Sequence, residues 1–413
     1  MKRIAIGLLG VIACGLGIWQ AARIGVARTL AQYALVANDR EAAARAVRVL
    51  PSDAETHATR GLILQHTENY SEAIRELERA VQLRPRDYFP WMILGVTRDL
   101  NGDPNGAINA LRESIELAPS YAKAHWQLGN LWLRLGQTDE AFRELRFASS
   151  SDPAFLPNVI DLAWGVSRND SARTVAAIQP QTDSARIALA LFFAQHKQGS
   201  AALDQFHALK SLSDERVHDL VHGLLTAKLF PEAYEIWARL HNATMSTSLL
   251  LNGSFEDEVD VGQSGFGWQI PAEPSNTTIS IDPSQFQSGA KSLRIDFHGN
   301  SKSTDTLASQ VAIVKAETRY QLTLYSQSKD FVSAAAPVIS VIDAVDENNI
   351  MARSSSLVSD SNGWRAISID LTSGKETKAI IIRLSRQECA SDPCAAFGTL
   401  WVDSFALSER RTK

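Results

Sequence analysis

The chain lacks the sequence features that mark most enzymes and nucleic-acid-binding proteins. It has no glycine-rich phosphate loop, no nucleophile elbow and no evident pair of carboxylates for glycoside hydrolysis. With 41 basic and 46 acidic residues the net charge is -5, which argues against nucleic acid as the main partner. Because 45% of the residues are hydrophobic, long disorder is not expected either. We therefore expect a folded protein without enzymatic activity, with room for two or three domains.

Cysteine is also scarce, with Cys14, Cys389 and Cys394 as its three occurrences. The last two bracket Ala-Ser-Asp-Pro, a turn-forming sequence, and a bond between them would stabilise the fold by about 2 kcal/mol in the chain-entropy model. No second cluster of cysteine or histidine lies nearby to complete a metal site, so the alternative is two free thiols. We predict a disulfide, which fits an oxidising compartment.

Histidine offers no convincing metal site. His218-Asp-Leu-Val-His222 would place two imidazoles on one helical face. Zinc peptidases of the His-Glu-x-x-His type have glutamate where this chain has Asp219, and no third ligand is evident. We interpret the pair as two histidines on a partly exposed helix.

A repeat dominates the first half of the chain. Pro85, Pro119 and Pro153 are equally spaced. Each is preceded at fixed distances by a small residue, an alanine and a glycine; these are Ala80, Ser114 and Ala148, then Ala73, Ala107 and Ala141, then Gly61, Gly95 and Gly129. A fixed period of about 34 residues predicts stacked supersecondary units rather than one globular core.

Each unit has the pattern of two helices, which in the third unit span residues 122–135 and 138–149. Proline then ends the second helix. The pattern resembles the tetratricopeptide repeat, carried here by Trp91-Leu94-Gly95, Ala107, Leu111 and Pro119. The resemblance covers three repeats, residues 54–155, and implies an α-solenoid.

The repeat continues in weaker form on both sides. Residues 23–53 form a degenerate unit, and residues 156–243 form irregular helices that extend and cap the solenoid. The helices expected there span residues 156–167, 184–197, 201–209, 214–228 and 231–241.

The resemblance implies a partner-binding concave surface lined by positions 2, 5, 9 and 12 of each first helix. In this chain those positions are Glu55, Ala58, Leu62, Gln65, Phe89, Met92, Val96, Asp99, Lys123, Trp126, Asn130 and Leu133. We select Phe89, Met92, Val96, Trp126 and Asn130 as the candidate partner-binding residues, because aromatic and apolar side chains anchor protein segments. The alternative is that following helices cover Trp126 as part of the core.

The N-terminus resembles a membrane anchor. Residues 4–22 contain one clearly polar side chain, Gln20, behind a short basic start, and about 20 apolar residues span a bilayer as a helix. Trp19 stands where an interfacial aromatic would. We predict an uncleaved signal anchor over residues 1–22, with the bulk of the chain outside the cytoplasm of a bacterium. Two processing alternatives are lipidation at Cys14 and cleavage after Ala27.

From about residue 244 the helical pattern gives way to alternating apolar residues. The alternation occurs in residues 292–297, 320–324, 338–342 and 367–371, separated by glycine and asparagine turns. Many short strands at such spacing predict a β-sandwich, here over residues 249–409.

Short motifs at both ends of this region resemble those of jelly-roll carbohydrate-binding modules attached to bacterial polysaccharidases. The motifs are Leu251-Asn-Gly-Ser-Phe-Glu256, Gly267-Trp268, Gly289-Ala-Lys-Ser-Leu293 and Gly398-Thr-Leu-Trp-Val-Asp403-Ser-Phe405. The resemblance implies a jelly roll whose first and last strands lie side by side.

The resemblance also implies a structural calcium ion held by oxygens of Asn252, Glu256 and Asp403. A hard cation prefers several oxygen ligands, including one or two carboxylates. In the alternative, Glu256 and Asp403 are solvated or accept hydrogen bonds from turn amides.

Glycan binding by such modules requires exposed aromatic rings, and the candidates are Trp268, Tyr325, Phe331 and Trp364. Tyr325 is out of phase with its apolar neighbours and therefore points away from the core. Trp268 and Trp364 stand where related modules bury a core aromatic, so a core role is the alternative for each. A domain that has lost sugar binding and serves in adhesion is a further alternative.

These features predict a scaffold anchored in a bacterial inner membrane, with its repeats binding a protein and its jelly roll a polysaccharide. A role in exopolysaccharide assembly or export follows from association alone. The alternatives are a glycan-active enzyme with an unrecognised site and a structural assembly factor that binds no sugar.

Overall fold

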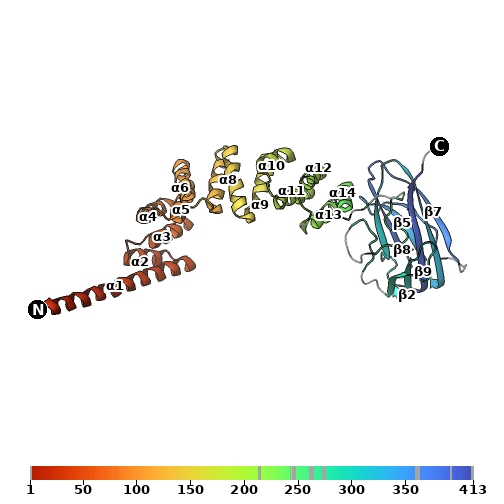
Figure 1. Cartoon of the computed structure of the whole chain (residues 1–413), viewed down its shortest axis with the longest axis horizontal. Coiled ribbons are helices and arrows are strands. Elements are labelled where there is room, and N and C mark those ends of the chain that lie inside the picture. The colour runs from red at the N-terminus through yellow and green to blue at the C-terminus, as the bar shows by residue number, and fades with distance from the viewer. Residues whose placement is uncertain are drawn as a thin grey trace. The chain divides into compact units, whose positions relative to one another are not determined.

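Figure 1 shows the computed structural model, which describes residues 2–212, 215–241, 243, 248–259, 265–271, 276–358, 363–390 and 393–410, with side chains from residue 11 onward. A helical region is followed by a β domain of two antiparallel sheets, as the sequence predicts. The chain divides into two compact units, residues 1–179 and 180–413. The boundary falls within the helical region, so the last helices belong to the same unit as the β domain.

The first unit begins with α1 (Lys2–Ala37), which extends well past the apolar segment predicted as an anchor. Its second half packs as a repeat helix, because Arg23 donates through Nη2 to the carbonyl of Val49, 2.7 Å away, at the end of α2 (Arg40–Val49). No helix in the described part of the chain is long and apolar enough to cross a membrane. The transmembrane helix predicted over residues 4–22 is therefore not found.

Three helix pairs follow at the predicted spacing. They are α3 (Ala54–His66) with α4 (Tyr70–Leu83), α5 (Tyr88–Leu100) with α6 (Pro104–Leu117), and α7 (Ala122–Arg134) with α8 (Thr138–Ser151). Each predicted helix of the third unit agrees with the structure within two residues.

Inside each pair a glycine faces a leucine at very short range. A Cβ added to Gly95 would lie 2.6 Å from Cγ of Leu111 and 3.1 Å from the carbonyl oxygen of Ala107. Gly61 and Gly129 face Leu77 and Leu145 in the same way. The glycine recurs with the period because any side chain there would force the paired helices apart.

The first unit ends with η1 (Pro153–Phe155), α9 (Leu156–Val166) and α10 (Ser171–Ile178). The sequence predicts α9 but not α10. With 8 residues, α10 is too short to show a periodic pattern, and it is identified by its N-cap, since Asp170 accepts a hydrogen bond from the amide of Arg173.

The second unit begins with α11 (Asp183–Gln195), α12 (Gly199–His207), α13 (Arg216–Thr226) and α14 (Phe230–Leu240). These helices lie within a few residues of the predicted ranges. They form two further antiparallel pairs in which each helix contacts its sequence neighbour.

The strands of the β domain form two sheets, both antiparallel throughout. The five-stranded sheet has the order β1-β2-β9-β4-β7 and the four-stranded sheet the order β3-β8-β5-β6. The strands are β1 (Thr277–Asp282), β2 (Ser292–Ser301), β3 (Ala308–Ile313), β4 (Arg319–Ser333), β5 (Pro337–Asp343), β6 (Ile350–Arg353), β7 (Arg365–Thr372), β8 (Ala379–Arg386) and β9 (Cys394–Glu409).

Apolar residues from both sheets form one core between them, in the alternation that the sequence predicts. The opening segment of the domain runs beside its last strand. The amide of Leu249 donates to the carbonyl of Leu407 at 3.0 Å, and that of Phe405 donates to the carbonyl of Gly253 at 2.8 Å. The first and last segments are therefore neighbours, as the resemblance to jelly-roll modules implies.

Helices α13 and α14 cover part of the outer face of the four-stranded sheet. Phe230 is buried there with Ala344 and Ala379, and Lys228 Nζ donates to the carbonyl of Val345. On the five-stranded sheet, by contrast, outward-facing residues of β7 such as Ser368 are exposed. The open sheet face of the domain is thus on the five-stranded sheet.

The glycine–leucine contact predicts opposite effects for two glycine-to-alanine changes in the first unit. Gly95→Ala should lower the free energy of unfolding by about 1–3 kcal/mol, because its methyl group would overlap Leu111. Gly165→Ala, where a Cβ meets nothing within 4 Å, should raise it by up to about 1 kcal/mol. Urea unfolding followed by circular dichroism would measure both, and equal effects of the two changes would contradict the explanation.

Candidate functional site

A groove of about 280 Å³ opens between α1, α3 and α5 of the first unit. Four predicted concave-surface residues line it, namely Glu55, Ala58, Leu62 and Phe89. The opposite wall is formed by Gln32 and Leu35 of α1. The degenerate N-terminal unit therefore completes the groove of the first regular repeat.

The two aromatic side chains predicted on the concave surface differ in their exposure. Phe89 is 40% exposed in the groove, whereas Trp126 on α7 is half-buried and stacks on Phe155 with ring centroids 5.1 Å apart. Phe155 is missing from the predicted set. It stands one full repeat after Tyr121, which packs against Tyr88 at 4.8 Å, so the repeat spacing could have found it.

Met92 does not belong to an exposed strip, contrary to the prediction. It is 4% exposed and lies in a core to which α4, α5, α6 and α7 contribute. Tyr121 packs against the same core. Val96 is also packed against that core, and half-buried Asn130 donates to the carbonyl of Trp126 at 2.8 Å.

Charged residues tie the walls of the groove together. The buried carboxylate of Asp53 accepts hydrogen bonds through Oδ1 from Arg28 Nη2 at 3.2 Å and Arg84 Nη2 at 3.3 Å. Arg28 Nε also lies 3.2 Å from Oε2 of Glu55. A buried carboxylate requires such pairing. The network connects α1, α3 and the end of α4 and leaves Arg84 and Glu55 facing the groove.

In the β domain, the predicted calcium ligands have protein partners. Asp403 is fully buried, and its Oδ2 accepts hydrogen bonds from the amides of Gln287 at 2.7 Å and Ser288 at 3.1 Å. Oε1 of Glu256 accepts from the amides of Ala290 at 2.8 Å and Lys291 at 3.1 Å. Both carboxylates therefore bind the backbone of one turn, residues 287–291.

The third predicted ligand does not join them. Oδ1 of Asn252 accepts a hydrogen bond from the amide of Asp257 at 3.1 Å, and its backbone carbonyl accepts one from Nε1 of Trp268 at 3.0 Å. Among the residues that the structure describes, no three His, Cys, Asp or Glu side chains are grouped to hold a metal ion. The geometry thus favours the turn-binding alternative, and calcium stays a prediction.

The predicted glycan-binding aromatics differ in exposure. Trp268 is 3% exposed and packs on Phe255 and Phe405 in the core, so it cannot stack on a sugar. Trp364 is half-buried just before β7. Tyr325 is half-buried on the outer face of β4, and its alternation with buried Leu324 confirms its predicted direction.

A polar network on the same sheet face was missed from the sequence. Nε1 of Trp401 donates to Oδ2 of Asp282 at 2.8 Å, and the guanidinium of Arg294 lies 5.6 Å from the centre of the indole ring. Burial opposes the charge of Asp282, but hydrogen bonds from Ser284 and Trp401 and the charge of Arg294 lower its pKa to about 2. Leu400 and Val402, the neighbours of Trp401 in β9, belong to the core cluster, and the alternation of side chains along a strand was the available signal for placing Trp401 on the other face.

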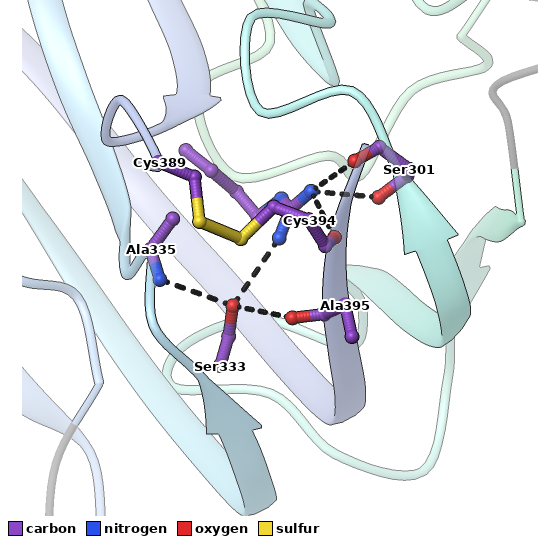
Figure 2. The surroundings of a disulfide bond; sticks show 7 residues. Ser301, Ser333, Ala335, Cys389, Cys394 and Ala395 are labelled. Atoms are coloured by element: carbon purple, nitrogen blue, oxygen red, sulfur yellow. Dashed lines mark hydrogen bonds between the residues drawn. A yellow bond between two sulfur atoms is a disulfide. The ribbon is translucent and has the colours of Figure 1, made fainter. Parts of the chain in front are cut away.

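Figure 2 shows Cys389 and Cys394 joined by a disulfide at the turn between β8 and β9. Beside it the buried guanidinium of Arg386 donates through Nη2 to the carbonyl oxygens of Ser301 at 2.7 Å and Cys394 at 2.9 Å. Nη1 donates to Oγ of Ser333 at 3.2 Å. The disulfide and the arginine together hold the start of β9 against β2 and β4.

Comparisons with known proteins concern the helical region. A tetratricopeptide-repeat family model matches residues 54–87. The chain is similar to the TPR repeat-containing thioredoxin TTL4 of Arabidopsis thaliana, at 32% identity over 94 residues, and the match covers 23% of this chain and 14% of that protein.

Two solved structures are also similar. YrrB, described as a TPR protein with an unusual peptide-binding site, has 16% identity, covering 52% of this chain and 89% of that one with a TM-score of 0.29. A thermophilic TPR protein of Thermus thermophilus has 21% identity, covering 50% and 99%, also with a TM-score of 0.29.

The turn contacts predict that Asp403 stabilises the β domain whether or not calcium binds. Asp403→Ala should cost about 1–3 kcal/mol, because it removes the buried carboxylate that accepts hydrogen bonds from the amides of Gln287 and Ser288. The exposed Glu258→Ala is the matched control and should change stability by less than about 0.5 kcal/mol. Thermal melting of the full chain, with calcium and with chelator, would separate the two roles. If chelation made wild type and Asp403→Ala melt alike, the carboxylate would be a calcium ligand instead.

Proposed function

We propose that this chain, a tetratricopeptide-repeat protein with a C-terminal β domain of two antiparallel sheets, is a scaffold that binds a protein partner through its helical repeats. The groove between α1, α3 and α5 carries the proposal. Phe89 and Leu35 remain 40% and 38% exposed there, although buried apolar side chains pack the helices around it. Grooves between helices with exposed apolar side chains are typical docking sites for protein segments.

The polar residues of the groove define what the partner segment needs. Arg84 and Glu55 are partly exposed at the walls and already engage Asp53 and Arg28. With Asp87, which also lines the groove, a bound segment meets a rim of one arginine and two carboxylates around an apolar floor. We expect it to bury apolar side chains on Phe89 and to extend toward Trp126 on the next repeat.

Trp126 tests the role of the repeats. Trp126→Ala should weaken capture of the native partner about thirtyfold, since truncating an aromatic anchor commonly costs about 2 kcal/mol of binding. Its effect on unfolding should be small, because Trp126 is half-buried and stacks on Phe155. Capture by the tagged full-length chain, quantified by mass spectrometry, would measure the loss.

Trp132 provides the matched control. It is packed against the core, so Trp132→Ala should destabilise the repeats by several times more than Trp126→Ala does. At a temperature where both variants are folded, Trp132→Ala should retain capture. Unchanged capture by Trp126→Ala would show that the partner docks elsewhere, and a large loss of stability in that variant would show that the ring is core.

A second proposed function is polysaccharide binding by the β domain. The strand order supports it: without β1, the two sheets have the orders 2-9-4-7 and 3-8-5-6, which is the arrangement of a jelly roll. The open face of the five-stranded sheet also carries Tyr325 and, two positions along β4, Gln327. An aromatic ring beside amide groups suits a sugar, which presents both apolar faces and hydroxyl groups.

Tyr325→Ala should therefore weaken glycan binding about tenfold, the equivalent of a lost ring contact. Tyr33→Ala is the control, because Tyr33 is an exposed tyrosine on α1, in the other unit. A glycan array probed with the full-length chain would first identify a ligand, and titration with that ligand would compare the variants. Absence of any bound glycan, or equal binding by both variants, would reject this site.

A further inference from the structure

Two buried histidines occupy equivalent places in the first and third regular repeats. Nδ1 of His57 on α3 lies 2.6 Å from Oε2 of Glu76 on α4, and Nε2 lies 2.9 Å from the carbonyl oxygen of Pro51. Pro51 follows α2, the last helix of the preceding unit. His57 therefore joins its own helix pair to the unit before it.

The third repeat contains the same arrangement. Nδ1 of His125 on α7 lies 2.7 Å from Oε2 of Glu144 on α8, and Nε2 lies 2.9 Å from the carbonyl oxygen of Pro119. The exposed ring of Phe147 stacks on the imidazole at 5.0 Å.

The repeat between them uses a different pair. Its equivalent positions, one repeat away from each histidine and each glutamate, hold Trp91 and Ala110. Nε1 of Trp91 donates to the carbonyl of Pro85 at 3.0 Å, so the proline carbonyl is satisfied in every repeat. Glutamate is present where the ring has a second nitrogen to bind, and alanine where it has none.

The protonation state follows from the partners. A carboxylate and a carbonyl oxygen can only accept hydrogen bonds, whereas a neutral imidazole has one N–H to donate. An imidazolium has two and satisfies both acceptors. Neutral histidine would leave one of these partly buried acceptors without a hydrogen bond from the ring.

The carboxylate beside each ring favours the same charged form. Burial opposes the charge of His57, but its hydrogen bonds to Glu76 and Pro51 and the charge of Glu76 outweigh burial and the repulsion from Arg79, and the pKa is raised above 6.5. Burial likewise opposes the charge of His125, and Glu144 and Pro119 raise its pKa. Arg60 on α3 lies 2.8 Å from Oε1 of Glu76 and helps to keep that carboxylate ionised.

We propose that His57 and His125 are pH-sensitive clasps between successive repeats, closed as imidazolium ions at acidic pH and released as the pH rises. Because the folded pKa exceeds the unfolded value near 6.5, the stabilisation is complete below about pH 6.5 and is lost as the pH rises through the folded pKa. Ala54, Glu55 and Ala58, which flank His57 on α3, line the groove. This consequence rests on the scaffold function proposed above: the closed clasps would make the partner-binding groove more rigid at acidic pH.

The titration can be observed directly in the full-length chain with histidines labelled with ¹³C at Cε1. His57→Gln and His125→Gln assign the two resonances, and the same chain unfolded in urea is the reference. Both clasp histidines should have a higher pKa in the folded chain than in the unfolded chain, and Glu76→Gln and Glu144→Gln should each lower the pKa of the partner ring. A folded pKa at or below the unfolded value, or no response to the glutamine variants, would overturn the proposal.

The stability effect has a control built into the repeats. The variant H57W/E76A/H125W/E144A places the middle repeat's pair in both clasps. Hydrogen exchange of the full-length chain, read by mass spectrometry and corrected for intrinsic rates, would be compared between pH 5.5 and 8.5. In the wild type, opening of α3 and α7 should increase with pH by up to about tenfold per pH unit, in the pH range between the unfolded and the folded pKa of the histidine. Opening of α5 should increase less.

In the variant with all four substitutions, hydrogen exchange of α3 and α7 should show the same pH dependence as that of α5. An unchanged pH dependence of α3 and α7 in the variant would reject the clasps. Loss of protection at both pH values would mean that the variant misfolds, and the titration of the glutamine variants then decides. Neither measurement uses a partner, so failure of the clasp and failure of the scaffold function are distinguishable.

Discussion

The helical repeats depend on the contact between one glycine and one leucine inside each pair. Because a Cβ on Gly61, Gly95 or Gly129 would overlap the facing leucine, the two helices reach a separation that no other residue permits. The second helix of each pair then packs on the first helix of the next pair, α4 on α5 and α6 on α7. The groove between α1, α3 and α5 is a consequence, since α3 and α5 contribute equivalent residues to it and α1 replaces the missing repeat on the other side.

The sequence predicted the helices and strands whose residues recur at a regular spacing. The constant period of the repeats located six helices, and alternation located β2, β4, β5 and β7. It did not predict the short helix α10, which has no repeating pattern, and it predicted a separate membrane segment where α1 is one helix of 36 residues. Local hydrophobicity could not show that this helix continues and that Arg23 on it packs against α2.

The candidate site was predicted less well because exposure depends on neighbours that no pattern specifies. Position 5 of the first helix holds Met92 in one repeat and Trp126 in the next, yet only Met92 is buried in the core. In the β domain, the alternation of apolar residues along β4 correctly predicted that Tyr325 points outward. It could not reveal that Asp403 and Glu256 bind the same turn, because their partners are backbone amides about 115 and 35 residues away in the chain.

Those carboxylates and the repeat histidines illustrate one physical requirement, that polar groups left by turns and helix ends must be paired once they are buried. The carbonyls of Pro51, Pro85 and Pro119 end successive units and always receive a ring N–H. Tryptophan meets the requirement with one nitrogen. Histidine meets it with two, and its second nitrogen then needs an acceptor, which explains why Glu76 and Glu144 accompany histidine while Ala110 accompanies tryptophan. The choice between the two pairs leaves the fold unchanged and decides whether a buried charge, with its dependence on pH, is part of it.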